Sequence, residues 1–269
     1  MSDSRNPQAR QDAPGARPLP FDSPASLESG RGDPSTWGSV RLLDLEPDLA
    51  EGLSDAERVV AARILIRALR VPAGPWSPPD ALRGAMGMVV LSGQLIRTGR
   101  TFARPDVQLL GPGDVAECRV LADSHGEWRA LEQAQLAVLD DRFVLAARRW
   151  PVLMTGLAHR LFEAQHEQHT RTAIVAMPRV EERILALLCH LAGRWGHVTA
   201  NGVTLSLPVT HETLGALIGA RRPTVSLALL ALDQQELLSR REDRTWLLPA
   251  DSVQWPTTGV PMGRPELAA

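Results

Sequence analysis

The stretch from residue 208 to residue 248 constrains the fold more than any other part of this 269-residue chain. Thr210 is a favourable N-cap for a short helix, and Glu212 in the first turn of that helix would interact well with its dipole. Gly219 then allows a tight turn, because glycine accepts a positive φ. A second helix follows, and Pro223 is compatible with its first turn, where backbone N–H groups have no partner inside the helix. The stretch therefore predicts two short helices joined by a turn.

The second of these helices has one apolar and one polar face. The apolar residues recur at helical spacing and are expected to face the core: Val225, Ala228, Leu229 and Leu232. The opposite face, at the N-terminal end, carries Arg222, Thr224, Ser226 and Leu227. Two helices joined by about four residues, the second with a polar N-terminal face, are typical of a helix-turn-helix that places its second helix in the major groove of DNA.

A hairpin is predicted directly after the second helix. Residues 237–248 alternate as strand, turn and strand, which is typical of a wing beside a helix-turn-helix. Three arginines of this segment, Arg240, Arg241 and Arg244, could bind DNA phosphates.

The residues before this stretch predict a helix and a small hairpin. Met177-Pro178 is expected to end a preceding helix, because the residue before proline disfavours helical geometry. A further helix is predicted from Arg179 to Gly193. Asn201-Gly202, between two short β-prone runs, is a strong signal for a hairpin turn.

The segment from Arg179 to Leu248 resembles the C-terminal domain of Crp-Fnr regulators. In that family a small hairpin leads through a Leu-Pro-(apolar)-Thr step into the helix-turn-helix, and this chain has Leu207-Pro208-Val209-Thr210. The family usually continues with Gly-x-Ser-Arg-Glu-Thr-Val-(Ser/Gly)-Arg. The corresponding residues here are Gly219-Ala220-Arg221-Arg222-Pro223-Thr224-Val225-Ser226.

The resemblance implies a sequence-specific transcription regulator that binds double-stranded DNA as a homodimer. It implies no catalytic activity and no cofactor, and it makes RNA polymerase a candidate partner. Arg222 matches the family's base-reading arginine, which can make a bidentate contact with guanine O6 and N7. Thr224 and Ser226 match positions near the backbone and the groove. The residues expected to contact DNA are Thr210, His211, Arg221, Arg222, Pro223, Thr224, Ser226, Leu227, Arg241 and Arg244.

Two departures from the family pattern predict a different operator preference. Pro223 replaces the usual glutamate, and Leu227 replaces the usual second arginine, both of which read base edges in the family. Leu227 could touch a thymine methyl group instead.

The first half of the chain predicts a helix and then several short strands. Ser54 and Glu57 fit a capping box, with the helix expected to continue through Arg70. Short apolar runs separated by Gly and Pro turns then suggest a small β-barrel or sandwich. The candidate strands are Met86–Leu91, Leu95–Thr98, Val107–Leu110 and Leu136–Asp140.

A long amphipathic helix of about 25 residues is predicted after Pro151, which suits a first helical turn. Its apolar residues recur at spacings of three and four: Leu153, Leu157, Leu161 and Ala164. Such a helix suits a dimer seam. The alternative is a helix that packs only on its own barrel.

These patterns, with the resemblance, predict an α+β protein in five parts. Residues 1–36 and 251–269 are expected to be disordered tails, because the first is rich in Pro, Ser, Gly, Asp and Arg and the second has Pro and Gly at short intervals. By resemblance, residues 37–149 form a jelly-roll β-barrel of the cyclic-nucleotide-binding type and residues 150–177 a long dimerisation helix. Residues 178–250 form the winged helix-turn-helix.

The expected sensor barrel lacks the family's signature for cyclic nucleotides. Gly111-Pro-Gly-Asp-Val115 resembles the glycine turn before the phosphate cassette. No Arg-Ser-Ala or Arg-Thr-Ala step follows between residues 114 and 130, and Arg119 and Arg129 fall out of register. We therefore expect no binding of cyclic AMP, and a small-molecule effector that is unknown or lost.

Composition excludes several other classes. The formal net charge of −2 provides no overall basic field, so a DNA-binding surface must come from local placement of charge. Cys118 and Cys189 are too few for a disulfide framework or an iron–sulfur cluster. No apolar run is long enough to cross a bilayer, and residues 1–20 lack the apolar core of a secretory signal. The expected location is the cytoplasm, without membrane association.

Three alternatives remain open at this stage. His159, Glu163, His166 and His169 lie roughly on one helix face and could hold a metal at a dimer seam, although a solvated face of mixed charge is favoured. The helix-turn-helix could serve protein or ligand contact instead of DNA. The barrel could be a cupin-like metal enzyme, but residues 86–140 offer only His125 as an imidazole ligand.

Overall fold

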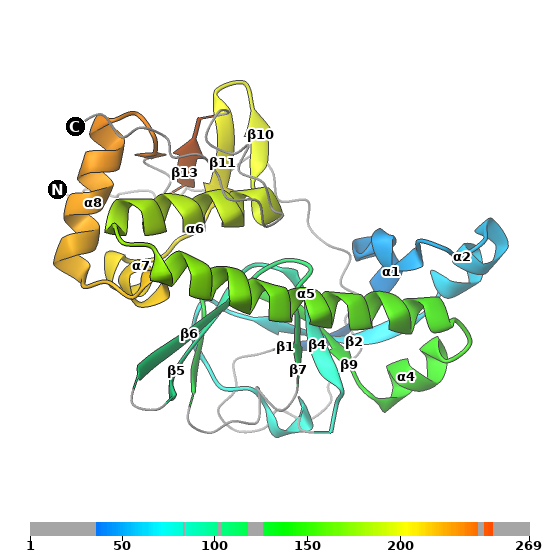
Figure 1. Ribbon diagram of the computed structural model, residues 1–269. Coiled ribbons are helices and arrows are strands. Elements are labelled where there is room, and N and C mark those ends of the chain that lie inside the picture. The colour runs from blue at the N-terminus through cyan, green and yellow to red at the C-terminus, as the bar shows by residue number, and fades with distance from the viewer. Residues whose placement is uncertain (1–35, 83, 102–103, 118–125, 242–244, 250–269) are drawn as a thin grey trace, which may run out of the picture.

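The computed structural model describes residues 36–249 with gaps at 83, 102–103, 118–125 and 242–244. Within this range a β-barrel is followed by one long helix and a C-terminal domain of helices and short strands (Figure 1). The predicted tails lie outside the described residues. The one exception is Thr36, which was assigned to the tail but is the first residue of a strand.

The barrel consists of two antiparallel sheets that enclose an apolar core. The five-stranded sheet has the order β1 (Thr36–Arg41), β2 (Leu65–Val71), β9 (Ala134–Leu139), β4 (Gly87–Ser92) and β7 (Val115–Glu117). The four-stranded sheet has the order β3 (Gly74–Trp76), β8 (Glu127–Ala130), β5 (Leu95–Thr101) and β6 (Arg104–Leu110). Met88 and Leu136 from the first sheet pack with Leu95 and Trp128 from the second. This core holds the two sheets face to face.

Helices cover the outer face of the five-stranded sheet. They are α1 (Leu42–Leu45), the 3₁₀ turn η1 (Pro47–Ala50), α2 (Asp55–Ala61), α4 (Asp141–Ala147) and the N-terminal half of α5 (Pro151–Ala176). A second 3₁₀ turn, η2 (Asp80–Leu82), precedes β4. Phe143, Leu153 and Leu157 are buried against Val89 and Ala137 of the sheet. The barrel therefore fixes one end of α5.

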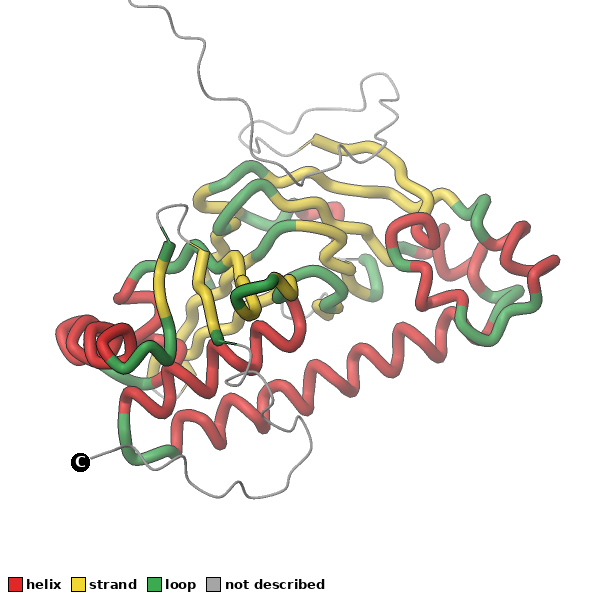
Figure 2. Tube along the Cα trace, turned by 90° about the horizontal axis from the view of Figure 1, so that it is seen from above, coloured by secondary structure: helices red, strands yellow, loops and turns green. Residues whose placement is uncertain are grey.

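The long helix is confirmed as α5, which has 26 residues and carries Pro151 in its first turn. It ends at Ala176, and the extended backbone of the C-cap residue Met177 leads into Pro178. Figure 2 shows α5 as one continuous helix along the barrel, with α6 beside its C-terminal part. A single element thus connects the barrel to the C-terminal domain.

The C-terminal domain encloses its own core. Its helices are α6 (Val180–Trp195), α7 (His211–Ile218) and α8 (Arg222–Gln234). Its sheet has the order β10 (His197–Thr199), β11 (Gly202–Ser206), β13 (Thr245–Leu248) and β12 (Ser239–Arg240). The predicted helix after Pro178, the hairpin at Asn201-Gly202 and the wing are all present.

The helix predicted from Ser54 to Arg70 was wrong in its second half. The capping box is present, since Ser54 Oγ accepts from Glu57 N–H and Glu57 Oε2 accepts from Ser54 N–H. The helix nevertheless ends at Ala61, and residues 65–71 form β2. β2 pairs with both β1 and β9, so sheet hydrogen bonds on its two sides replace the helical ones. β1 was not predicted, and local spacing in the sequence gave no sign that residues 65–71 pair with the predicted strand that became β9.

The four predicted strands of the barrel are confirmed as β4, β5, β6 and β9, with small shifts at their ends. Asp140 was expected in the last strand, but it is the N-cap of α4, where its carboxylate accepts from Phe143 N–H. The short strands β3, β7 and β8 were not predicted, because three or four residues are too few for a periodic pattern.

No single helix among the described residues is long and apolar enough to span a membrane. Only α7 and α8 taken together reach that length and composition, and they are bent by 96° relative to each other.

Candidate nucleic-acid interface

The helix-turn-helix has the geometry predicted for it. Thr210 Oγ1 accepts from Thr213 N–H at 3.1 Å and caps the start of α7. Gly219 ends α7 in the left-handed conformation, with φ of 69°. α8 begins three residues later with Pro223 in its first turn. The 96° bend between the two helices is within the range of this motif.

α8 separates a buried from an exposed face. Val225, Ala228 and Leu232 are buried in the core of the C-terminal domain. On the other side the exposed residues are Arg221, Arg222, Pro223, Thr224 and Leu227, the last with 70% of its surface accessible. The side chains predicted to meet base edges are therefore accessible to a partner.

Ser226 is half-buried, and it links α8 to α7. Its Oγ lies 2.9 Å from Nδ1 of His211 and 3.1 Å from the carbonyl oxygen of Arg222. Burial, together with the charges of Arg240 and Arg222, lowers the pKa of His211. Sequence reasoning included both residues in the site but did not predict their contact, because fifteen residues separate them along the chain.

The wing is fixed to the start of the helix-turn-helix. Arg240 donates to the carbonyl oxygen of Val209 at 3.4 Å, and its guanidinium lies 4.9 Å from the ring centre of Trp246. Trp246 in turn donates from Nε1 to the carbonyl oxygen of Leu207. Arg241 is exposed directly after the end of β12, and Arg244 lies outside the described residues. The wing thus places Arg240 beside the start of α7.

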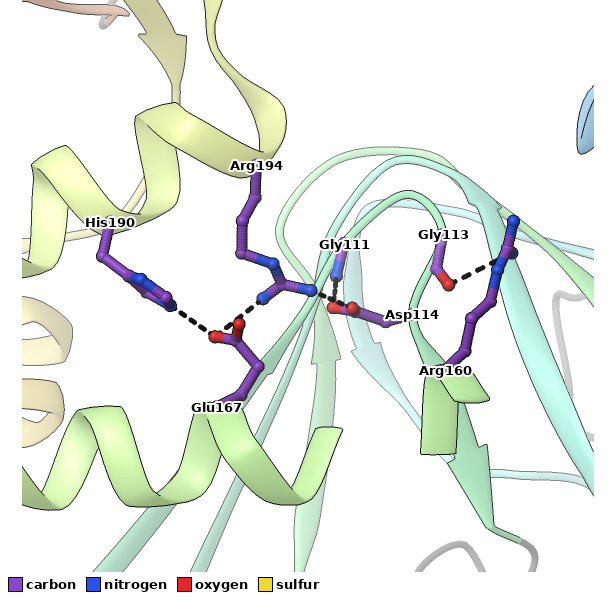
Figure 3. A network of polar contacts seen from close by, with 7 residues as sticks. All are labelled: Gly111, Gly113, Asp114, Arg160, Glu167, His190 and Arg194. Atoms are coloured by element: carbon purple, nitrogen blue, oxygen red, sulfur yellow. Dashed lines mark hydrogen bonds and ion pairs between the residues drawn. The ribbon is translucent and has the colours of Figure 1, made fainter. Parts of the chain in front are cut away.

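A polar network joins the C-terminal domain to α5 and the barrel (Figure 3). Arg194 of α6 forms ion pairs with Asp114 of the barrel and, at 3.2 Å, with Glu167 of α5. Glu167 also contacts His190 Nε2 at 2.5 Å. Asp114 accepts in addition from Gly111 N–H, which closes the glycine turn. We call Asp114, Glu167, His190 and Arg194 the interdomain network.

The pKa values of the two carboxylates of the interdomain network are shifted in opposite directions. Burial raises the pKa of Asp114 and outweighs the opposing charge of Arg194. Burial alone would also raise the pKa of Glu167. The hydrogen bond from His190 and the charge of Arg194 together outweigh burial, so the pKa of Glu167 is lowered.

Apolar contacts support the same docking. Ile96 and Val107 of the barrel belong to the buried cluster of the C-terminal domain. Gly111 lies against Trp195 of α6, so close that a Cβ there would be 2.4 Å from the indole ring. Gln94 Nε2 donates to the carbonyl oxygen of Ser206 at 2.7 Å. The docking leaves the exposed face of α8 uncovered.

The glycine turn at residues 111–114, which was expected to precede a phosphate cassette, is contacted by two arginines of the same chain. Arg194 contacts Asp114, and Arg160 of α5 donates to the carbonyl oxygen of Gly113 at 3.3 Å. Much of the expected cassette, residues 118–125, lies outside the described residues.

The other predicted ligands do not converge within one chain. His159 and Glu163 lie 3.3 Å apart on the exposed side of α5. Among the residues that the structure describes, no three His, Cys, Asp or Glu side chains form a group suited to a metal ion. Cys189 is a buried thiol whose pKa is raised by burial to about 12, whereas Cys118 and His125 lie outside the described residues.

Comparison with known proteins agrees with this geometry. Residues 182–250 match the family model of the Crp-like helix-turn-helix domain. No curated protein matches the sequence.

Several solved structures share the fold. A CooA mutant from Carboxydothermus hydrogenoformans is 18% identical, with a TM-score of 0.56, and the match covers 79% of this chain and 93% of the other. A cyclic nucleotide-binding domain containing protein from Listeria monocytogenes is 16% identical, with a TM-score of 0.57 and coverage of 69% and 90%. A transcriptional regulator of the CRP family from Thermus thermophilus is 17% identical, with a TM-score of 0.52 and coverage of 68% and 93%. At these identities the likeness shows the fold.

Proposed function

We propose that this chain, whose residues 182–250 match the Crp-like helix-turn-helix domain, is a DNA-binding transcription regulator of the Crp-Fnr family and reads a two-fold symmetric operator as a homodimer. The observation that carries the proposal is the exposed N-terminal face of α8. The opposite face of the helix is buried in the core of the C-terminal domain, and the wing lies beside it. A rigid helix with an accessible polar end is what major-groove recognition needs.

Residues at the start of α8 would make three kinds of contact with the operator. Arg222 reads a guanine through O6 and N7, and Leu227 touches a thymine methyl group. Thr224 and Ser226 of α8, with Arg221 at its N-cap, contact the groove and backbone.

The remaining residues would position the protein on the duplex. Thr210 and His211 at the start of α7, with Arg241 and Arg244 of the wing, contact phosphates on either side of the groove. Pro223 fixes the first turn of α8, where it replaces the base-reading glutamate of the family.

Homodimerisation would use the face of α5 that its own chain leaves open, because the apolar residues first expected at the seam, Leu153, Leu157 and Leu161, pack on the barrel of the same chain. Exposed residues recur there at spacings of four and three: Thr155, His159, Phe162, His166, His169, Ala173 and Ala176. Phe162 has 73% of its surface exposed although it is the largest apolar side chain of this face. The spacing is that of the a and d positions of a two-stranded coiled coil, with Phe162, Ala173 and Ala176 as the apolar members of the repeat.

The barrel would act as scaffold or as sensor of an effector that is not cyclic AMP. The arginine step that holds a cyclic phosphate is missing from the sequence, and Asp114 is already paired with Arg194. A regulator of this kind works in the cytoplasm, beside DNA and RNA polymerase, and needs no catalytic activity.

Selection from a random pool of DNA duplexes tests this proposal. The full-length protein should enrich sites with two half-sites related by two-fold symmetry and about one helical turn apart. The control is Arg58→Ala, which changes an exposed residue of α2, at the opposite end of the molecule from α8 (Figure 1), and should enrich the same sites. Enrichment of no sequence, with binding that weakens steeply with salt, would contradict the proposal.

A further inference from the structure

We propose that His211 makes operator binding proton-linked, so that this protein binds its operator more tightly as the pH falls through the range in which the imidazole takes up a proton. The inference rests on the proposed function and adds a regulatory input to the same surface. It concerns a single atom, Nε2 of His211, and the contact that this atom makes with a DNA phosphate.

Hydrogen-bond accounting fixes the tautomer of His211. The Ser226 hydroxyl has one proton, and its Oγ lies 3.1 Å from the carbonyl oxygen of Arg222, which can only accept. Ser226 Oγ must therefore accept from the imidazole, which lies 2.9 Å away through Nδ1. The proton of neutral His211 is thus on Nδ1, and Nε2 carries a lone pair.

Nε2 is consequently the atom that titrates. Among the residues that the structure describes, it has no hydrogen-bond partner. In the neutral ring its lone pair repels a phosphate oxygen, whereas in the charged ring the same nitrogen donates a charge-assisted hydrogen bond. One proton therefore converts an unfavourable phosphate contact into a favourable one.

The surroundings of His211 disfavour its charged form in the free protein. Arg222 on α8 and Arg240 on β12 act on it as like charges, and Glu212, exposed on α7, is its sequence neighbour. Burial and these two arginines lower the pKa of the imidazole in the free protein. DNA phosphates at the same surface reverse the sign of the local field, and an opposite charge favours the protonated form.

The direction of the linkage follows from this difference. His211 has a higher pKa in the complex than in the free protein, so binding takes up protons. The gain is fully present at a pH below the free-protein value and is lost as the pH rises through the value in the complex. Uptake of one proton changes the affinity by up to about tenfold per pH unit for each protomer.

Fluorescence anisotropy with the selected operator tests the proposal, at constant ionic strength between about pH 6 and about pH 8.5, where histidine titrates. The wild type should lose affinity as the pH rises. His211→Gln should bind with little pH dependence and more weakly than the wild type at the acidic end. His211→Arg, which keeps a permanent positive charge, should bind tightly across the range.

The matched control is His197→Gln on β10, an exposed histidine that should retain the wild-type slope. Thermal unfolding of each variant verifies that it is folded. A wild-type affinity independent of pH, or an undiminished slope in His211→Gln, would overturn the inference while leaving the proposed function intact. Failure of the wild type to select any operator would overturn the proposed function and this inference together.

Discussion

At the scale of single residues, the surface of α8 that we propose to read DNA differs from the Crp-Fnr pattern in the side chains that it would offer to the major groove. Leu227 stands where a second base-reading arginine is usual, and it is 70% exposed at the N-terminal half of α8. A side chain of this kind gains nothing from contact with water and can discriminate bases only through apolar contact. The thymine methyl group is the apolar feature of the major groove.

Removal of that methyl group should therefore weaken binding. Replacing the thymine beneath Leu227 by deoxyuridine should reduce the affinity roughly fourfold, since one buried methyl group contributes about 0.8 kcal/mol. Leu227→Ala should bind both duplexes with nearly equal affinity in the same anisotropy assay. A deoxyuridine placed outside the two half-sites is the control, and an equal loss there would argue against the contact.

At the scale of elements, the sequence predicted those parts whose signals are local. The capping box at Ser54, the turn at Gly219 and the hairpin at Asn201-Gly202 each depend on a few neighbouring residues, and all are present. The segment 65–71 was misassigned because its conformation depends on pairing with two strands distant in sequence. Local helical spacing could not outweigh those two ladders of hydrogen bonds.

At the same scale, we predict that the exposed face of α5 forms the dimer interface. Phe162→Asp should convert the dimer into a monomer, because it places a charge on each side of a buried seam, where an unpaired charge is costly. Sedimentation velocity measures the change. Val198→Asp is the control, since Val198 is 87% exposed on β10 and away from α5. A dimer that survives Phe162→Asp would place the interface elsewhere.

At the scale of the whole molecule, the interdomain network makes the barrel, α5 and the C-terminal domain one body. Arg194 bridges Asp114 and Glu167, which are eighty and twenty-seven residues away along the chain. No local sequence pattern identifies these four residues. The sequence therefore predicted the candidate site on α8 but not the ion pairs that hold the C-terminal domain against the barrel. The only early signal was the glycine turn at residues 111–114, which was interpreted as part of a ligand site.

The stability of this body should depend on pH through Glu167. Its pKa is lowered in the folded protein, so its stabilising contribution is complete above the unfolded value of about 4.3 and is lost as the pH falls through the folded value. Glu167→Gln should therefore be less stable than the wild type at neutral pH, with a difference that shrinks below about pH 4.3.

Urea unfolding of the two proteins over that range measures the difference. Burial raises the pKa of Asp114, and the charge of Glu167 adds to that shift, so the same two proteins are also compared in an Asp114→Asn background, which isolates Glu167. Equal stability at neutral pH, or a difference that grows in acid, would contradict this role of the network.

Recognition of DNA through α8 is tested most directly by a double-mutant cycle between Arg222 and the guanine assigned to it. Wild type and Arg222→Ala are titrated against the selected operator and against the same operator with the guanine assigned to Arg222 replaced, by anisotropy at several salt concentrations. We predict that the wild type prefers the intact operator by about 1–3 kcal/mol per half-site and that Arg222→Ala loses this preference while still binding DNA. Undiminished discrimination by Arg222→Ala, or equal binding of both duplexes by the wild type, would contradict recognition through α8.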